Sequence, residues 1–201
     1  MEPTGRALQP GATDKLDAIE ECYRRGWTDG LPVVPPVADK VATMLASVGL
    51  APEHVVSQEP VRRRVLTAER AAANAVMAGC LPEHCEIWAA TNAPGWLILV
   101  NGSLRWRLGL GCTDNLLSSA NRANATIGRA VRLILLNGLE SRPGIIPDRG
   151  CMGSLCKVWV CFGEDEERSP WPPFHVTRGC EPEASTVTVA SVQDPEMLGN
   201  R

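Results

Sequence analysis

The chain has 201 residues, a net charge of −3 and 21% charged residues. This weakly acidic chain carries no basic stripe, which excludes an electrostatic nucleic-acid binder, and no apolar run reaches the length of a membrane span. The first residues lack a basic and apolar signal, so we expect a cytoplasmic protein. We predict a flexible arm at 1–13 and a single α/β (or α+β) domain at 14–201, with layered helices on a small mixed sheet.

Two residue types are used unusually. Eight cysteines in a chain expected to be cytoplasmic indicate reduced thiols, metal ligands or redox chemistry rather than a disulfide framework. Six tryptophans stand against one tyrosine and two phenylalanines. Because tryptophan supplies a large and rigid contact area, this bias suits a surface that binds a partner protein.

The first part of the chain predicts two helices around a rigid loop. Thr13 or Asp14 is a suitable cap for a helix that runs to about Arg25. Residues 26–36 contain three prolines and two glycines, which fix an extended path suited to a site wall or a docking segment. A second helix is expected near 39–48. The first helix should have one apolar face, made of Leu16, Ile19, Cys22 and Tyr23.

The next stretch predicts a strand and a sharp corner between helices. The strand is expected around His54–Gln58, and Arg62–Arg64 is interpreted as a solvated face. A helix of small residues should lie between Thr67, a suitable N-cap, and Gly79, which suits the left-handed residue after a helix. Pro82 suits the first position of the helix that follows.

The second half alternates apolar runs with polar loops. Short strands are predicted at Trp96–Asn101 and Lys157–Phe162, and an alternating pattern predicts a last strand at Ser185–Ala190. The acidic run Glu164–Glu167 has the composition of a solvated turn. A long helix should begin near Asn121, and its apolar stripe comprises Ile127, Ala130, Val131, Ile134, Leu135 and Gly138.

The opening turns of that long helix are a natural pocket for an anion. Amide and guanidinium groups at a helix N-terminus bind anionic groups well, so Asn124 and Arg129 are predicted to hold a substrate, with Arg168 as a further candidate. Asp29 is predicted to help orient that substrate. Ordinary capping is the alternative interpretation of Asn121 and Asn124.

Cys80 is the leading candidate for a reactive thiol. It lies just before a predicted helix N-terminus, where backbone dipoles lower a thiol pKa and favour the thiolate. A reactive thiol needs a proton acceptor, for which Glu83 and His175 are the candidates. Cys85 is a second candidate thiol. The alternative is that Cys80 is a small buried apolar residue at a crowded corner.

The remaining cysteines leave the metal and redox interpretations open. Gaps of four residues separate several neighbouring cysteines, which is marginal spacing for zinc or iron–sulfur ligands. This pattern leaves the cofactor unassigned, with a metal held by cysteines as an open alternative. The candidates for resolving or metal-ligating thiols are Cys85, Cys112, Cys151, Cys156 and Cys161.

Five ordered blocks, spread from about Gly26 to Val192, resemble a bacterial protein family with no established reaction. Members of this family are often encoded beside small proteins that carry a Cys-Gly-Ser-Cys motif or its selenocysteine form. The blocks are Trp27-Thr-Asp-Gly-Leu-Pro with Pro35-Pro36, Asn74-Ala-Val-Met-Ala-Gly-Cys80-x-Pro-Glu83, Val100-Asn-Gly102, Arg122-Ala-Asn-Ala-Thr-Ile-Gly-Arg129, and Glu166-Glu-Arg-Ser-Pro-Trp171 with His175-Val-x-Arg-Gly179.

The resemblance implies a protein partner and thiol or selenol redox chemistry. Cys80 and Cys161 fall inside blocks that resemble the family, whereas the other candidate thiols are particular to this chain. Members of the family tend to continue further, so Arg201 is expected to mark the end of one subunit of a split enzyme.

We therefore expect a subunit of a heteromeric enzyme. It would use Cys80 for thiol-dependent chemistry on a small anionic or carbonyl-bearing substrate. The first alternative is a non-catalytic scaffold subunit, homo- or hetero-oligomeric, that docks a Cys-Gly-Ser-Cys or selenocysteine partner. The second alternative is a metalloenzyme with cysteine-ligated zinc or iron–sulfur.

Overall fold

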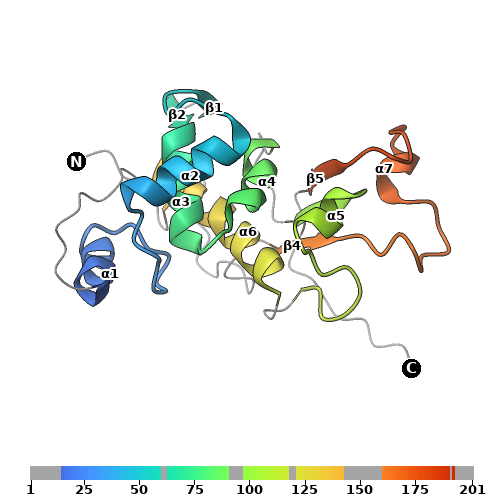
Figure 1. Ribbon diagram of the computed structural model, residues 1–201, viewed down its shortest axis with the longest axis horizontal. Coiled ribbons are helices and arrows are strands. Elements are labelled where there is room, and N and C mark those ends of the chain that lie inside the picture. The colour runs from blue at the N-terminus through green and yellow to red at the C-terminus, as the bar shows by residue number, and fades with distance from the viewer. Residues whose placement is uncertain are drawn as a thin grey trace.

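The computed structural model describes residues 15–59, 63–90, 97–117, 121–142, 160–190 and 192. Helices and two small sheets form an α/β fold, as predicted. The helices α2 (Ala38–Val48), α3 (Ala68–Ala78), α4 (Cys85–Ala90) and α6 (Arg122–Leu133) lie between α1 (Lys15–Arg24) at one end and α5 (Leu104–Arg107) and α7 (Phe174–Thr177) at the other (Figure 1). None of the helices in the described ranges has the length and apolar character needed to cross a lipid bilayer.

The α3 helix is the centre of the core. It packs against α2 and α6, and all but two of its 11 residues are buried. Alanines make up much of α3, so the neighbouring helices can approach it closely on several sides. The Thr67 side chain accepts a hydrogen bond from Arg70 N, and Gly79 ends the helix with φ of +87°. Both predicted helix boundaries are therefore confirmed.

The α1 helix ends where the sequence predicts, but its buried face is different. Ala18 and Cys22 are buried, whereas Leu16 is 68% exposed. Leu16 lies two residues before Ala18, which turns it roughly 200° around the helix axis. The prediction that Leu16 shares the apolar face is therefore wrong.

A hairpin precedes α3, and the sequence analysis predicted only its first strand. Strand β1 (Val55–Glu59) pairs in antiparallel fashion with β2 (Arg64–Thr67). Arg64, interpreted above as part of a solvated face, is the first residue of β2 and forms an ion pair with Glu140. Arg63 and Arg64 are both exposed, so the interpretation as a solvated face holds for these two residues. Arg62 lies outside the described residues.

The larger sheet has three strands in the order β4–β3–β5. The central strand β3 (Leu97–Asn101) is parallel to β4 (Val160–Gly163) and antiparallel to β5 (Thr186–Ala190). This confirms the predicted mixed sheet. Trp96 and residues 157–159, assigned to strands above, lie outside the described residues. The carboxyl ends of β3 and β4 meet at one edge of the sheet, next to α5.

The long helix α6 is capped by Asn121, whose side-chain oxygen accepts a hydrogen bond from Asn124 N at 3.0 Å. Its predicted stripe is buried except for the half-buried Leu135. At Ile134–Gly138 the helix continues as a single turn of π-helix, η2. That turn positions the buried Asn137, whose Nδ2 donates to Trp27 O at 2.7 Å and to Asn74 Oδ1 at 2.8 Å.

Candidate functional site

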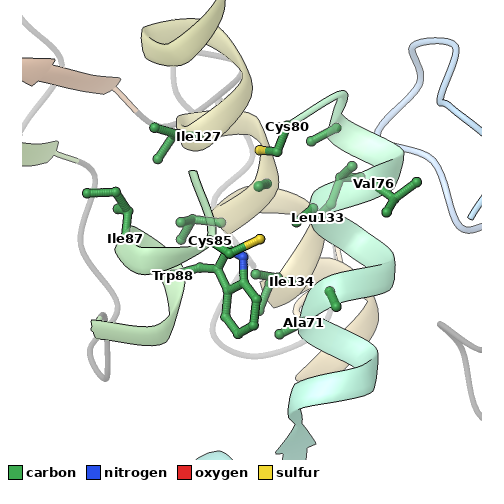
Figure 2. Close-up of a cluster of buried hydrophobic side chains, with 14 of the residues drawn as sticks. Ala71, Val76, Cys80, Cys85, Ile87, Trp88, Ile127, Leu133 and Ile134 are labelled. Carbon is green, nitrogen blue, oxygen red and sulfur yellow. The ribbon is translucent and has the colours of Figure 1, made fainter. Parts of the chain in front are cut away.

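Cys80 lies at the predicted corner, between α3 and the short 3₁₀ helix η1 (Pro82–His84). Only 6% of it is exposed, and it sits among apolar side chains from α3, α4 and α6 (Figure 2). Among the described residues, its Sγ donates a hydrogen bond to Thr126 O at 3.3 Å and makes none to Glu83 or His175. Within the described ranges, the hydrogen-bond partner of this thiol is therefore a backbone carbonyl.

The predicted low pKa of Cys80 is wrong. Burial raises the pKa of Cys80 to about 12, and the hydrogen bond with Thr126 and the charge of Arg122 offset only part of that effect. The sequence argument relied on the dipole of the following helix. The 3₁₀ turn η1 runs directly into α4, so a helix start does follow Cys80, but the cost of removing a thiolate from water outweighs that dipole.

The histidine at this corner is His84, not His175. His84 is buried, and its Nδ1 accepts a hydrogen bond from Leu81 N at 3.2 Å and lies 3.4 Å from Thr126 Oγ1. Burial lowers the pKa of His84, although the charge of Glu83 opposes this. Glu83 itself is exposed. The predicted pairing of Cys80 with Glu83 or His175 is therefore not present.

The other candidate thiols are buried where the structure describes them. Cys85 Sγ lies 3.3 Å from Met44 Sδ, and burial raises the pKa of both Cys85 and Cys161. Cys112 is buried beside Arg105, and burial raises its pKa as well. Within the described ranges, no three His, Cys, Asp or Glu side chains are arranged to hold a metal ion. Cys151 and Cys156 lie outside those ranges.

Asp29 and Arg129, predicted to hold a substrate, bind each other. Arg129 donates from Nε to Asp29 Oδ2 at 2.9 Å and from Nη2 to Asp29 Oδ1 at 2.8 Å. Nη2 also donates to the backbone oxygens of Leu31 and Pro32. Burial alone would raise the pKa of Asp29, but the hydrogen bonds and charge of Arg129 outweigh it and lower that pKa. The guanidinium thus clamps loop 26–36 onto α6.

Asn124 and Arg168 also have partners within the chain. Asn124 Oδ1 accepts a hydrogen bond from Gly111 N at 2.9 Å, which ties the glycine-rich loop to the start of α6. Arg168 Nε lies 2.7 Å from Asp165 Oδ2 in an exposed ion pair. The predicted anion-binding residues therefore contact different parts of the chain and do not converge on one pocket.

The structure reveals a polar cluster that the sequence analysis missed. Arg105 is only 2% exposed, and its Nη2 binds Glu166 Oε2 at 2.9 Å and Glu167 Oε1 at 2.8 Å. Its Nε donates to Gly102 O at 3.0 Å, and Nη1 donates to Glu164 O. The acidic run includes a turn, as interpreted, and Glu167 is exposed, but the buried cation draws the carboxylate of Glu166 inward, so the run is only partly solvated.

Asn101 extends this cluster to the end of β3. Its Nδ2 donates to Glu166 Oε1 at 2.8 Å and to Glu164 Oε2 at 2.5 Å. Glu166 also accepts a hydrogen bond from Gly102 N, and Glu164 accepts one from Phe174 N. We name the Arg105 network by its members: Asn101, Gly102, Arg105, Glu164, Glu166 and Glu167.

The Arg105 network lies at the carboxyl edge of the parallel pair β3–β4, where α/β proteins commonly bind ligands. A signal for it was present in the sequence, since Asn101 and Gly102 stand at the end of an apolar run that forms β3. Its partners could not be chosen, because Arg105 and Glu166 are 61 residues apart. His175 belongs to this region, since Phe174 N binds Glu164, and His175 Nε2 lies 3.2 Å from Pro182 O.

Two tryptophans are exposed at the same end of the molecule as the Arg105 network. Trp106 on α5 is 58% exposed and Trp171, between β4 and α7, is 75% exposed (Figure 1). Trp171 N donates to Ser169 Oγ at 3.2 Å, and prolines flank the ring on both sides in sequence. Arg105 lies over the Trp106 ring, 5.0 Å from its centroid.

Comparison of the chain with models of protein families, with curated proteins and with solved structures finds no match. What this chain does therefore has to follow from the contacts described above.

Proposed function

We propose that this chain is a non-catalytic subunit that docks a partner protein through its α5/α7 end, with Trp106 and Trp171 as the anchors. The observation that carries this proposal is the exposure of Trp171, at 75%, on backbone that is already fixed. An exposed tryptophan of this kind buries a large area on binding and loses little conformational freedom.

The surroundings of the two rings support docking. The backbone around Trp171 is restricted by Pro170, Pro172 and Pro173. The backbone N–H of Trp171 also donates a hydrogen bond to Ser169 Oγ. The Arg105 network fixes residues 164–167 to the end of β3, so the segment that carries Trp171 starts from a rigid base. Interfaces combine such aromatic anchors with a polar rim, and the exposed Arg107 directly follows Trp106 while the exposed Arg168 lies three residues before Trp171.

The expected thiol enzyme centred on Cys80 has less support. Because burial raises the pKa of Cys80 to about 12, its thiol form predominates over the thiolate at neutral pH. The thiol chemistry implied by the family resemblance would then belong to the partner, a Cys-Gly-Ser-Cys or selenocysteine protein, and this chain would position it.

The test is a binding titration between the purified chain and a Cys-Gly-Ser-Cys-motif protein. Trp171→Ala should weaken binding by roughly 30-fold or more, as expected of an aromatic anchor. Leu16→Ala is the matched control, because Leu16 is 68% exposed on α1 at the opposite end of the molecule (Figure 1). Equal affinities for the wild type, Trp171→Ala and Trp106→Ala would overturn the proposal.

A further inference from the structure

Three polar atoms beside the Arg105 network are buried without a hydrogen-bond partner among the described residues. They are Asn101 Oδ1, His175 Nδ1 and Thr186 Oγ1. Asn101 is fully buried and His175 is 1% exposed. Because an unpaired buried polar atom destabilises a fold, such an atom usually marks the place of a ligand or of an ordered water.

The three residues are neighbours in the fold. Asn101 and Thr186 are directly opposite each other in the β3–β5 pair, so their side chains share one face of the sheet. Asn101 Nδ2 and Phe174 N donate to the same oxygen, Glu164 Oε2, at 2.5 and 2.8 Å. His175 follows Phe174 directly and binds Pro182 O, four residues before Thr186. The three residues that carry the unpaired atoms are therefore connected, through the β3–β5 pair and Glu164, at the end of β3.

The hydrogen bonds of His175 Nε2 and Asn101 Nδ2 indicate whether the unpaired atoms of these two side chains are donors or acceptors. A carbonyl only accepts, so His175 Nε2 must carry the proton that it gives to Pro182 O. In the neutral imidazole, Nδ1 is then an acceptor. Asn101 Nδ2 donates to two carboxylates, which identifies the unpaired Oδ1 as an acceptor too. The Thr186 hydroxyl can also accept.

The charge around these acceptors is negative. In the Arg105 network, the carboxylates of Glu166 and Glu167 bind the guanidinium of Arg105, whereas the carboxylate of Glu164 accepts hydrogen bonds from two neutral donors, Asn101 Nδ2 and Phe174 N. Three carboxylates therefore share one cation within the network, which leaves an excess of two negative charges (3 − 1 = 2). A positively charged hydrogen-bond donor would therefore be favoured here over a neutral donor or an anion.

We propose that Asn101, His175 and Thr186 form a binding site for the primary ammonium group of a small amine. A primary ammonium has three N–H donors and no acceptor, which matches three acceptors in an acidic surrounding. A water molecule has only two donors and no charge. A metal ion is a poorer match, because no three His, Cys, Asp or Glu side chains in the described ranges are arranged to hold one. This site is distinct from the docking anchors and does not depend on a partner.

The test uses the full chain and methylammonium chloride as the probe, with tetramethylammonium chloride at equal ionic strength as the comparison. Tetramethylammonium has the same charge and no N–H donor. The ¹⁵N chemical shifts of the His175 imidazole report directly on a donor at Nδ1. We expect a saturable shift with methylammonium and none with tetramethylammonium.

Two conservative variants complete the experiment. Thr186→Val removes one acceptor without changing the shape of the side chain and should weaken methylammonium binding about tenfold or more. Thr188→Val is the matched control, since Thr188 lies two residues along β5 on the same face, and it should bind as the wild type does. An equal response to both salts, no saturable response, or a long-lived buried water with no amine response would each overturn the proposal.

Discussion

Arg105 Nη2 lies 2.9 Å from Glu166 Oε2, although the two residues are 61 positions apart in the chain. This ion pair joins α5 to the turn after β4 and places the carboxylates at the end of the parallel strands. Arg105 is almost fully buried, so the ion pair forms only when folding brings Glu166 next to it.

The buried ion pair should dominate the stability of this end of the molecule. Arg105→Met leaves Glu166 buried without its cation, so the free energy of unfolding should fall by about 3–5 kcal/mol in urea titrations. Arg107→Met is the matched control, because Arg107 forms an exposed pair with Glu86 and should cost about 0.5 kcal/mol or less. Equal losses for the two variants would show that the Arg105 pair is no more important than a surface pair.

The Asp29–Arg129 clamp should make stability depend on acid. The pKa of Asp29 is lowered from its ordinary 3.8, so the clamp stabilises the fold above 3.8, and that stability is lost as the pH falls through the lowered folded value. Asp29→Asn should remove this part of the acid dependence and lower the free energy of unfolding at neutral pH by about 3 kcal/mol. Asp39→Asn, on the exposed start of α2, should leave both unchanged. An identical acid profile for Asp29→Asn and the wild type would contradict the clamp.

His84 should produce a second pH dependence, at higher pH. Burial lowers the pKa of His84 from 6.5, so the unfolded chain binds a proton that the folded chain does not. The free energy of unfolding should therefore decrease as the pH falls below 6.5, until the lowered folded pKa is reached. His84→Asn should flatten this slope, whereas His54→Asn, at an exposed position, should keep it. Urea titrations at several pH values would measure the free energy of unfolding of both variants and of the wild type.

Thiol reactivity should follow burial. Cys180 is only partly buried, whereas Cys80 and Cys85 are buried. When the native protein reacts with iodoacetamide, Cys180 should be labelled before Cys80, and mass spectrometry of the peptides would show the order. Labelling of Cys80 first at neutral pH would contradict the raised pKa.

Local features explain which parts of the fold could be predicted. Thr67 and Gly79 mark the ends of α3 through backbone chemistry that depends on adjacent residues alone, and both predictions are confirmed. The edge of the sheet depends on distant residues, so Arg105 and the acidic run could not be paired in advance. Strand β2 was missed because its arginine-rich start resembles a solvated segment.

The candidate site was harder to predict for the same reason. Asp29 and Arg129 were both chosen as functional residues, yet only the fold shows that each is the other's partner. The low pKa expected for Cys80 came from one local effect, the following helix, whereas burial by α4 and α6 is a property of the whole core (Figure 2).

The most direct measurement of the central claim compares two variants in the assembled complex with the Cys-Gly-Ser-Cys partner. We predict that Trp171→Ala weakens partner binding by roughly 30-fold or more, while Cys80→Ala keeps both binding and the catalytic turnover of the complex. Turnover that disappears in Cys80→Ala, with binding intact, would contradict the account and return the reactive thiol to this chain.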